Sequence, residues 1–250
     1  VMSKLAFIFP GQGAQKAGMG KDFYENSEAA RSFFDQAQKI LDFDLKEMCF
    51  GEHEELNLTE YTQPCMVSVC LAIVQELKKR GINPDITAGL SLGEYAAVAA
   101  AGGMNELDAI KLVRRRGILM QSTVPAGEGA MAAVLGLDAK KIEEILESFE
   151  NVWIANYNCP GQIVITGLTN EVQQASLALK EAGAKRVVEL KVSGPFHSLL
   201  LKPAGEALLK EMESMSFSTL QVPYVANATA EIVTDSKKIS TFFAKGIYSS

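Results

Sequence analysis

The spacing of apolar residues divides the first part of the chain into alternating strands and helices. An apolar run at Leu5–Phe9 stops at a Pro-Gly pair, which predicts a buried strand that leads into a glycine-rich loop. From Gln63 to Arg80 the apolar residues recur on one helical face, and Thr62 can cap the start of this helix. A short strand at Asp85–Ala88 and an alanine-rich helix at 94–101 follow. This alternation predicts an α/β fold.

The middle of the chain has a different order of predicted strands and helices. Its apolar patterns predict a strand, a helix, two strands, a helix and a strand, at 130–135, 139–149, 152–156, 162–166, 170–182 and 186–190. A βαββαβ order is typical of a ferredoxin-like unit. We therefore expect residues 126–191 to form an inserted subdomain, and residues 1–125 and 192–250 to form the larger subdomain around it. A helix near 203–215 and a strand at 222–226 complete the larger part.

Composition and charge limit the classes of function. Of the 250 residues, 48% are hydrophobic and 22% are charged, as in an ordinary globular protein. The net charge of −6 disfavours general nucleic-acid binding, because attraction to phosphate supplies most of that affinity. No apolar run approaches the roughly 20 residues of a membrane span, and the N-terminus lacks the features of a secretory signal. We expect a cytoplasmic protein that binds neither membrane nor nucleic acid.

Four cysteines and the basic residues carry weaker signals. Cys49, Cys65, Cys70 and Cys159 form no Cys-x-x-Cys pair and have no histidine close by in the sequence, so we expect no metal site and no redox motif. Because the chain is acidic overall, an acidic partner would need a local basic patch. The candidates for such a patch are Arg114, Arg115, Lys185, Arg186, Lys191 and Lys202, although for each residue taken alone an ordinary solvated side chain is the favoured interpretation.

The clearest candidate for a nucleophile is Ser91, in the run Gly89-Leu90-Ser91-Leu92-Gly93. This Gly-x-Ser-x-Gly run lies between a predicted strand and a predicted helix. A sharp turn of that kind projects the serine hydroxyl, and the glycines make room for the turn. The backbone N–H of Leu92 would then face the position where an oxyanion forms. The pattern is common by chance, so its context between strand and helix carries the inference.

A serine at its ordinary pKa needs a base within hydrogen-bond reach. The chain has two histidines. His53 lies in an acidic stretch that is most simply a solvated loop. His197 follows a predicted strand and Gly194-Pro195-Phe196, at a loop before a helix, and the order serine then histidine is that of the α/β-hydrolases. We therefore predict that His197 is the base.

Arg116 lies within the apolar stripe of a predicted helix at 106–122. At about 100° per residue it shares an arc with apolar residues, whereas Arg114 and Arg115 fall outside that arc. A buried guanidinium is costly unless a carboxylate or several acceptors pair with it. The partner is either internal, such as an aspartate, or a carboxylate that arrives with a substrate. Gly117 costs the helix about 1 kcal/mol relative to alanine, which suggests that something approaches closely there.

These residues belong to longer segments that resemble the malonyl-CoA:acyl carrier protein transacylases and the acyltransferase domains of fatty acid and polyketide synthases. The segments occur in family order across nearly the whole chain: Phe9-Pro10-Gly11-Gln12-Gly13-Ala14-Gln15, Gly89-Leu90-Ser91-Leu92-Gly93-Glu94-Tyr95, Arg116-Gly117 with Met120-Gln121, Pro125-Ala126-Gly127 with Gly129-Ala130-Met131, Asn156-Tyr157-Asn158 with Pro160-Gly161-Gln162, and Phe196-His197. Together they are far more specific than any one of them.

The resemblance implies an α/β-hydrolase-like large subdomain with a ferredoxin-like insertion. It implies that Ser91 is the nucleophile, His197 the base and Arg116 the clamp on the malonyl carboxylate, and that the backbone N–H groups of Gln12 and Leu92 form the oxyanion hole. The implied activity is transfer of malonyl from malonyl-CoA to the phosphopantetheine thiol of acyl carrier protein, in fatty acid biosynthesis. It implies no permanently bound cofactor and no metal.

The chain departs from the family pattern in three places. Leu90 stands where many members have histidine, and Gly246 stands where members usually have a glutamine that orients the catalytic histidine. The chain also stops at Ser250, short of the closing strand and helix of the family, so its C-terminal end looks truncated. For Gly246, three readings stay open: a different alignment, a backbone carbonyl in place of the glutamine, or impaired catalysis. The alternative functions are a serine hydrolase or thioesterase of the same fold, and a catalytically impaired module that binds acyl-CoA or the carrier.

Overall fold

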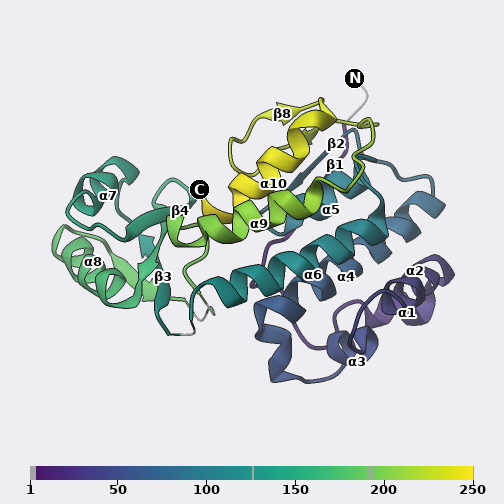
Figure 1. The fold of residues 1–250 in the computed structure, drawn as a ribbon, viewed down its shortest axis with the longest axis horizontal. Helices are drawn as coiled ribbons and strands as arrows, with labels where there is room; N and C mark the ends of the chain where they lie inside the picture. The colour runs from purple at the N-terminus through teal and green to yellow at the C-terminus, as the bar shows by residue number, and fades with distance from the viewer. Residues whose placement is uncertain (1–3, 126, 191, 193, 250) are drawn as a thin grey trace. The chain divides into compact units, whose positions relative to one another are not determined.

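The structure, a computed structural model, describes residues 4–125, 127–190, 192 and 194–249. The chain forms two compact units (Figure 1). The first consists of Val1–Ile118 and Leu209–Phe243, and the second of Leu119–Leu208 and Ala244–Ser250. The expected insertion at 126–191 falls within the second unit, and its end residues, Ala126 and Lys191, lie outside the described residues. Those boundaries therefore stay a prediction.

The sheet of the first unit places the ends of two sequence-distant strands side by side. Its strand order is β1-β2-β7-β8, with β1 at Ala6–Phe9, β2 at Ile86–Gly89, β7 at Tyr224–Val225 and β8 at Ile232–Val233. The first three strands are parallel, and β8 is antiparallel to β7. Phe9 lies opposite Gly89, so the loops that follow β1 and β2 leave the sheet at the same edge. In open α/β sheets that edge is where ligands bind.

Strand β1 is an outer strand of this sheet. Among the described strands it pairs with β2 alone, and the side chain of Ile8 is 78% exposed. The other face of the strand is better covered, since Phe9 is buried.

Helix α4, at Thr59–Lys79, begins earlier than the sequence pattern suggested (Figure 1). The expected cap, Thr62, lies inside the helix, and its hydroxyl donates to the carbonyl of Leu58 at 3.0 Å. Pro64 lies in the first turns and has no N–H for the carbonyl of Glu60. The guanidinium of Arg114 donates to that carbonyl at 2.7 Å instead. The helix therefore continues through the proline, and the prediction that Thr62 caps it is wrong.

The other helices of the first unit surround the sheet and α4. The predicted alanine-rich helix is α5 at Gly93–Ala100, and all of its residues are buried. Residues 21–58, to which the sequence pattern assigned no element, contain α1 at Lys21–Asn26, α2 at Glu28–Gln38 and α3 at Leu45–Phe50. Three helices run across the division between the units: α6 at Glu106–Thr123, α9 at Lys202–Met212 and α10 at Ile239–Tyr248.

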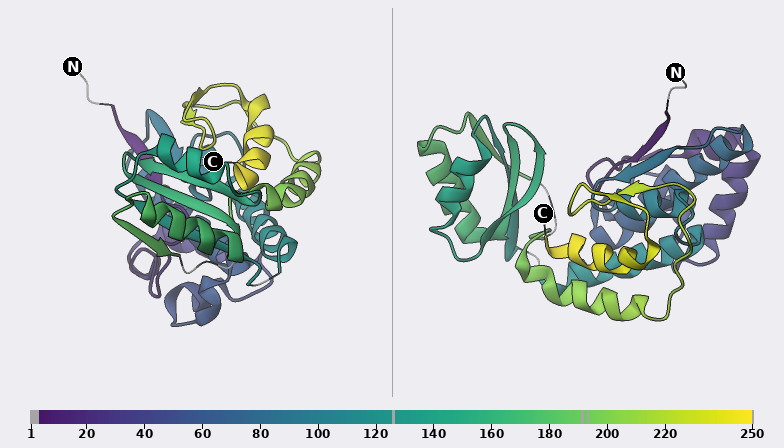
Figure 2. Two further views of the ribbon diagram at one scale, coloured as in Figure 1. Left: turned by 90° about the vertical axis from the view of Figure 1, so that its left-hand side faces the viewer. Right: turned by 90° about the horizontal axis from the view of Figure 1, so that it is seen from above.

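The second unit contains the predicted βαββαβ succession. Its elements are β3 at Gly129–Leu135, α7 at Ala139–Leu146, β4 at Val152–Cys159, β5 at Gln162–Leu168, α8 at Thr169–Glu181 and β6 at Arg186–Glu189. The sheet is antiparallel with the order β4-β5-β3-β6. Both helices cover one face of it (Figure 2), and a core that includes Ile142, Ile165 and Leu179 fills the layer between helices and sheet. The ferredoxin-like prediction is confirmed.

Candidate active site

Ser91 lies on a strained turn between β2 and α5. Its φ of 48° is in the left-handed region that non-glycine residues seldom occupy. Glycine is required on both sides, because a Cβ on Gly89 would overlap the backbone of Gly93, and a Cβ on Gly93 would overlap the carbonyl of Phe9. The predicted strand, sharp turn and helix are therefore present, and the turn raises Ser91 above the carboxyl end of β2.

The loop after β1 packs against this turn. The backbone N–H of Leu90 donates to the carbonyl of Phe9 at 3.1 Å, and a Cβ on Gly11 would lie 2.8 Å from the carbonyl oxygen of Leu90. The side-chain amide of Gln12 donates to the hydroxyl of Thr59 at 3.0 Å and anchors the loop to α4. The hydrogen bonds recorded within the described residues do not use the backbone N–H of Gln12 or Leu92, so both are available to an oxyanion. Their role as the oxyanion hole stays a prediction.

Arg116 reaches Ser91 from helix α6. Its side chain is 2% exposed, and its Nη2 donates to the hydroxyl oxygen of Ser91 at 3.0 Å. The guanidinium lies over the ring of Tyr95, with its carbon 5.2 Å from the ring centroid, which partly compensates the buried charge. Its Nε has no hydrogen-bond partner within the described residues. No ion pair between described residues includes Arg116, in contrast to its neighbours Arg114 and Arg115. The internal aspartate considered from the sequence is therefore absent from the described part of the chain.

The close approach expected at Gly117 comes from the backbone of α4. A Cβ at this position would lie 2.7 Å from the carbonyl oxygen of Thr59 and 2.8 Å from the Cα of Glu60. The glycine allows α6 to pack directly on the start of α4 and carries Arg116 to the turn that holds Ser91.

His197 belongs to the second unit and is also in the left-handed region, with φ of 58°. It is 6% exposed. Its backbone N–H donates to the carbonyl of Ile247 in α10 at 3.1 Å, and the hydroxyl of the next residue, Ser198, donates to the carbonyl of Pro195 at 2.7 Å. Gly246 is buried in α10 beside the carbonyl that accepts from His197. The hydrogen bond between His197 and α10 is thus made by the backbone N–H of His197. It fixes the position of the loop that carries the imidazole ring.

Ser91, Arg116, Gln12 and Leu92 therefore lie in the first unit, and His197 lies in the second. His53, the other histidine, contacts Glu47 at 3.0 Å in a partly exposed pair, as expected for a surface loop.

Two residues that the sequence analysis did not single out also surround Ser91. Asn227, just after β7, accepts the backbone N–H of Ser91 on its Oδ1 at 2.8 Å. Glu94 is 1% exposed, and burial raises the pKa of its carboxyl to about 7, although the N–H of Asn227 and the charge of Arg116 act in the opposite direction. In the sequence, Glu94 stands out as an acidic residue in a helix of otherwise small or apolar residues. Asn227 gave no such signal in the sequence.

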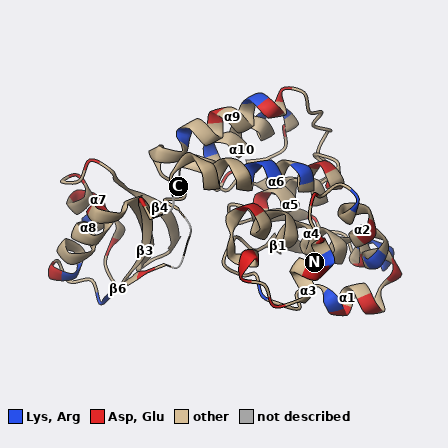
Figure 3. Ribbon diagram, turned by 60° about the horizontal axis from the view of Figure 1, so that its bottom comes forward, with Lys and Arg blue, Asp and Glu red and all other residues tan. Residues whose placement is uncertain are grey.

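The basic residues considered for a docking patch are mostly engaged with acidic partners. Arg114 bonds to Asp42 and Glu60, and Arg115 bonds to Glu211 at 2.6 Å, so both have acidic partners. A docking patch among the six candidates stays a prediction. Lys191 lies outside the described residues. Figure 3 shows basic and acidic residues interspersed along the helices.

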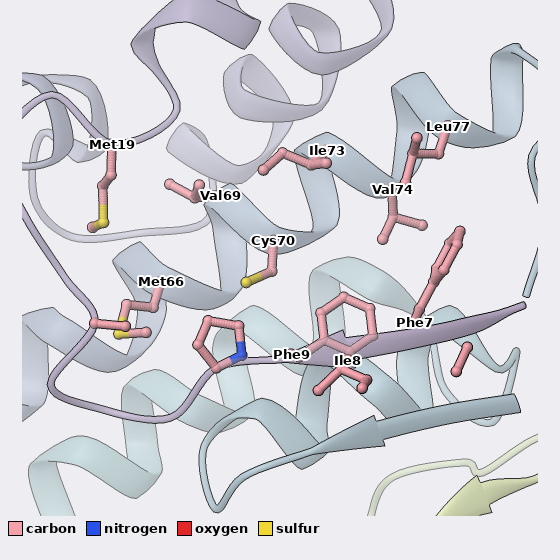
Figure 4. A pocket seen from close by; sticks show the side chains of 13 residues that line it. Phe7, Ile8, Phe9, Met19, Met66, Val69, Cys70, Ile73, Val74 and Leu77 are labelled. Atoms are coloured by element: carbon pink, nitrogen blue, oxygen red, sulfur yellow. The ribbon is translucent and has the colours of Figure 1, made fainter.

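An apolar cavity of about 380 Å³ lies between β1 and α4 (Figure 4). Phe7 and Phe9 on the strand and Val69 and Ile73 on the helix are among its lining residues, and none of the candidate site residues lines it. Cys70 also lines the cavity, and burial raises the pKa of its thiol to about 12, so the thiol is unreactive at neutral pH. No group of three or more metal-ligating side chains occurs among the described residues, and none of their helices is long and apolar enough to cross a membrane.

Comparison with known proteins gives independent information on the family of this chain. Residues 6–245 match the acyl transferase domain family. The malonyl CoA-acyl carrier protein transacylase of Bacillus subtilis is 46% identical over 253 residues, which cover 99% of this chain and 80% of the Bacillus protein.

Solved structures are equally similar. The acyl carrier protein S-malonyltransferase of Vibrio cholerae is 40% identical, with a TM-score of 0.95 over 99% of this chain and 82% of the other. A malonyl-transacylase solved in complex with its type II PKS acyl carrier protein is 38% identical, with a TM-score of 0.95 and the same coverage of both chains.

Proposed function

The chain belongs to the acyl transferase family, and from that premise we propose that it transfers malonyl from malonyl-CoA to the phosphopantetheine thiol of an acyl carrier protein, for fatty acid biosynthesis. Relatives that span almost all of the chain carry the name of this activity. One of them was solved with its acyl carrier protein, which supports a carrier as the acceptor. The cytoplasmic location expected from the sequence is part of the same proposal.

The observation that carries the proposal is a buried arginine whose Nη2 contacts the candidate nucleophile. Arg116 has an unpartnered Nε and no ion pair within the described residues. A guanidinium in this state is satisfied best by a carboxylate that binds two of its N–H groups at once. The malonyl group carries a free carboxylate next to its thioester, so one substrate can place its carboxylate on Arg116 and its thioester carbonyl at Ser91.

The first chemical step is attack on the thioester. His197 takes the proton of the Ser91 hydroxyl as the oxygen bonds to the thioester carbon. The carbonyl oxygen becomes an oxyanion that accepts from the backbone N–H groups of Gln12 and Leu92. The intermediate then collapses: the carbon–sulfur bond breaks, the sulfur of CoA takes the proton from His197, and malonyl remains as an ester on Ser91.

The second step is the reverse with a different thiol. His197 takes the proton of the phosphopantetheine thiol, the sulfur attacks the ester carbon, and the oxygen of Ser91 leaves with the proton. Because a thioester is exchanged for a thioester, the reaction needs no external energy source. If water attacked the ester in place of the thiol, the enzyme would be a hydrolase. The ratio of malonyl-carrier to free malonate therefore distinguishes the two activities.

The proposal is tested by the intact mass of the protein after exposure to malonyl-CoA. The wild type is expected to gain one malonyl group, and Ser91→Ala to gain none. Ser122→Ala, which removes an exposed hydroxyl from α6, is the matched control and should acylate like the wild type. Addition of acyl carrier protein should then discharge the adduct and form malonyl-carrier. A wild type without an adduct would overturn the proposal, and discharge to free malonate alone would favour the hydrolase.

The role of Arg116 predicts selective loss of activity with malonyl substrate. Arg116→Ala should lower kcat/KM for malonyl-CoA about 100-fold, since hydrogen bonds to a charged group contribute about 1.5–3 kcal/mol each, and should affect acetyl-CoA far less. Arg116→Lys keeps the charge but lacks the fork and should fall between. Arg115→Ala is the control, because this neighbouring arginine pairs with Glu211 at the surface. Equal losses with both acyl groups would show that Arg116 is structural.

A further inference from the structure

The backbone of Ser91 is held by a closed ring of three hydrogen bonds. Its N–H donates to Oδ1 of Asn227 at 2.8 Å. The N–H of Asn227 donates to Oε1 of Glu94 at 3.1 Å. The N–H of Glu94 donates in turn to the carbonyl of Ser91 at 3.1 Å. The ring thus joins the turn after β2, the first turn of α5 and the second residue after β7.

Ser91 needs an external constraint of this kind. A left-handed conformation costs a non-glycine residue about 1–3 kcal/mol and persists only when the surroundings fix it. Within the turn itself, Gly93 donates to the carbonyl of Leu90, and no turn carbonyl accepts from the N–H of Ser91. Asn227 supplies the missing acceptor. The N–H of Ser91 is therefore engaged with Asn227, whereas the hydrogen bonds recorded within the described residues do not use the N–H of Leu92.

Glu94 is buried, and within the described residues the one hydrogen bond recorded for its side chain is with the N–H of Asn227. The charged and titratable groups with which it interacts electrostatically are Arg116 on α6, the adjacent Tyr95 and Tyr224 on β7. None of these has a recorded hydrogen bond to its carboxyl. A carboxyl group in this position is costly to bury, and either its ionised or its neutral form can accept the N–H of Asn227.

We propose that Asn227 and Glu94 are positioning residues for the nucleophile: Glu94 fixes the backbone of Asn227, and the side chain of Asn227 holds Ser91 in the left-handed conformation that directs its hydroxyl toward Arg116. The inference depends on the proposed function in one respect: it takes Ser91 to be the residue that is acylated. Both residues act through the geometry of Ser91 and do not touch the substrate.

The first test measures the single-turnover acylation of Ser91 by malonyl-CoA over a range of concentrations. Asn227→Ala should lower the maximal acylation rate constant about 10- to 100-fold, the effect expected of a displacement near 1 Å, with little change in the half-saturating concentration. Glu94→Ala should lower it as well. Glu94→Gln, whose amide oxygen can still accept the N–H of Asn227, should restore most of the lost rate.

The matched control is Asn105→Ala. Asn105 also accepts backbone N–H bonds on its side chain, from Leu107 and Asp108 at the start of α6, and has no contact with Ser91. The Asn105→Ala variant should lower the Tm to a similar extent as Asn227→Ala. It should leave the acylation rate constant near that of the wild type. If Asn105→Ala slows acylation as much as Asn227→Ala, general destabilisation explains both variants and the positioning role is overturned.

A second measurement does not depend on activity. The exchange of the Ser91 amide hydrogen with solvent, followed by NMR, should accelerate at least about 10-fold in Asn227→Ala, because the amide loses its acceptor. Unchanged exchange, or a wild-type acylation rate in Asn227→Ala, would overturn the positioning role. A wild type that takes up no malonyl group would instead overturn the proposed function, and the exchange measurement would still decide whether Asn227 holds the turn.

Discussion

At the scale of single residues, the candidate chemistry coincides with unusual backbone conformations. Three non-glycine residues in the described part of the chain have positive φ, and two of them are Ser91 and His197. The sequence predicted the turn at Ser91 because glycines flank it, and it predicted the burial of Arg116 from its place in an apolar stripe. The bond from Ser91 to Asn227 joins residues 136 positions apart, and no local pattern contains it.

Glu94 predicts a specific dependence of stability on pH. The pKa of its carboxyl is about 7 in the folded protein and 4.5 as a free side chain, so between these values the folded state binds the proton more tightly than the unfolded state. The free energy of unfolding should therefore fall as the pH rises through this window, by about 3 kcal/mol in order of magnitude.

Glu94→Gln isolates this effect. The variant cannot ionise at this position, so its stability should rise relative to the wild type as the pH increases from about 4.5 to 8, while other titrating groups contribute equally to both proteins. Urea unfolding of the two proteins across this range measures the difference. Parallel stability curves would mean that the carboxyl of Glu94 titrates at its ordinary pKa.

At the scale of secondary structure, the sequence pattern located most of the elements but missed the three helices between residues 21 and 50. Helix α4 was found because its apolar face repeats over many turns, whereas α1 and α3 have only six residues each. Local signals for two of the missed helices exist in side-chain caps: Ser27, before α2, accepts the N–H of Ala30, and Asp44, before α3, accepts the N–H of Glu47. The start of α4 was misplaced: the helix begins at Thr59 and continues through Pro64. Arg114, distant in sequence, bonds to the carbonyl that the proline leaves free.

The contact between α6 and α4 predicts that Gly117→Ala destabilises the protein. Alanine improves helix propensity by about 1 kcal/mol, but its Cβ would lie 2.7 Å from the carbonyl oxygen of Thr59, and a backbone cannot yield as a flexible side chain can. Separating the helices should cost about 1–3 kcal/mol, so the net change is a loss. Urea unfolding measures it, with the exposed Lys111→Ala on the same helix as the control. A gain in stability would mean that the two helices separate freely.

At the scale of the whole molecule, the family and the α/β architecture could be predicted because their motifs recur in a fixed order along the chain. The comparisons confirm the family, and the strand order confirms the ferredoxin-like unit. The limits of the insertion and the roles of the site residues stay predictions. Ser91 belongs to one unit and His197 to the other, and neither apolar periodicity nor motif spacing relates residues of different units to one another.

The outer strand of the first sheet has a consequence for handling the protein at high concentration. Among the described strands, β1 pairs with β2 alone, so its other edge, beside the protruding Ile8, can recruit an extended segment from another molecule and start intermolecular sheet growth. Natural proteins block such growth with a lysine or a proline at the same kind of position. We therefore expect aggregation at high protein concentration to start at β1, a strand that carries none of the candidate catalytic side chains.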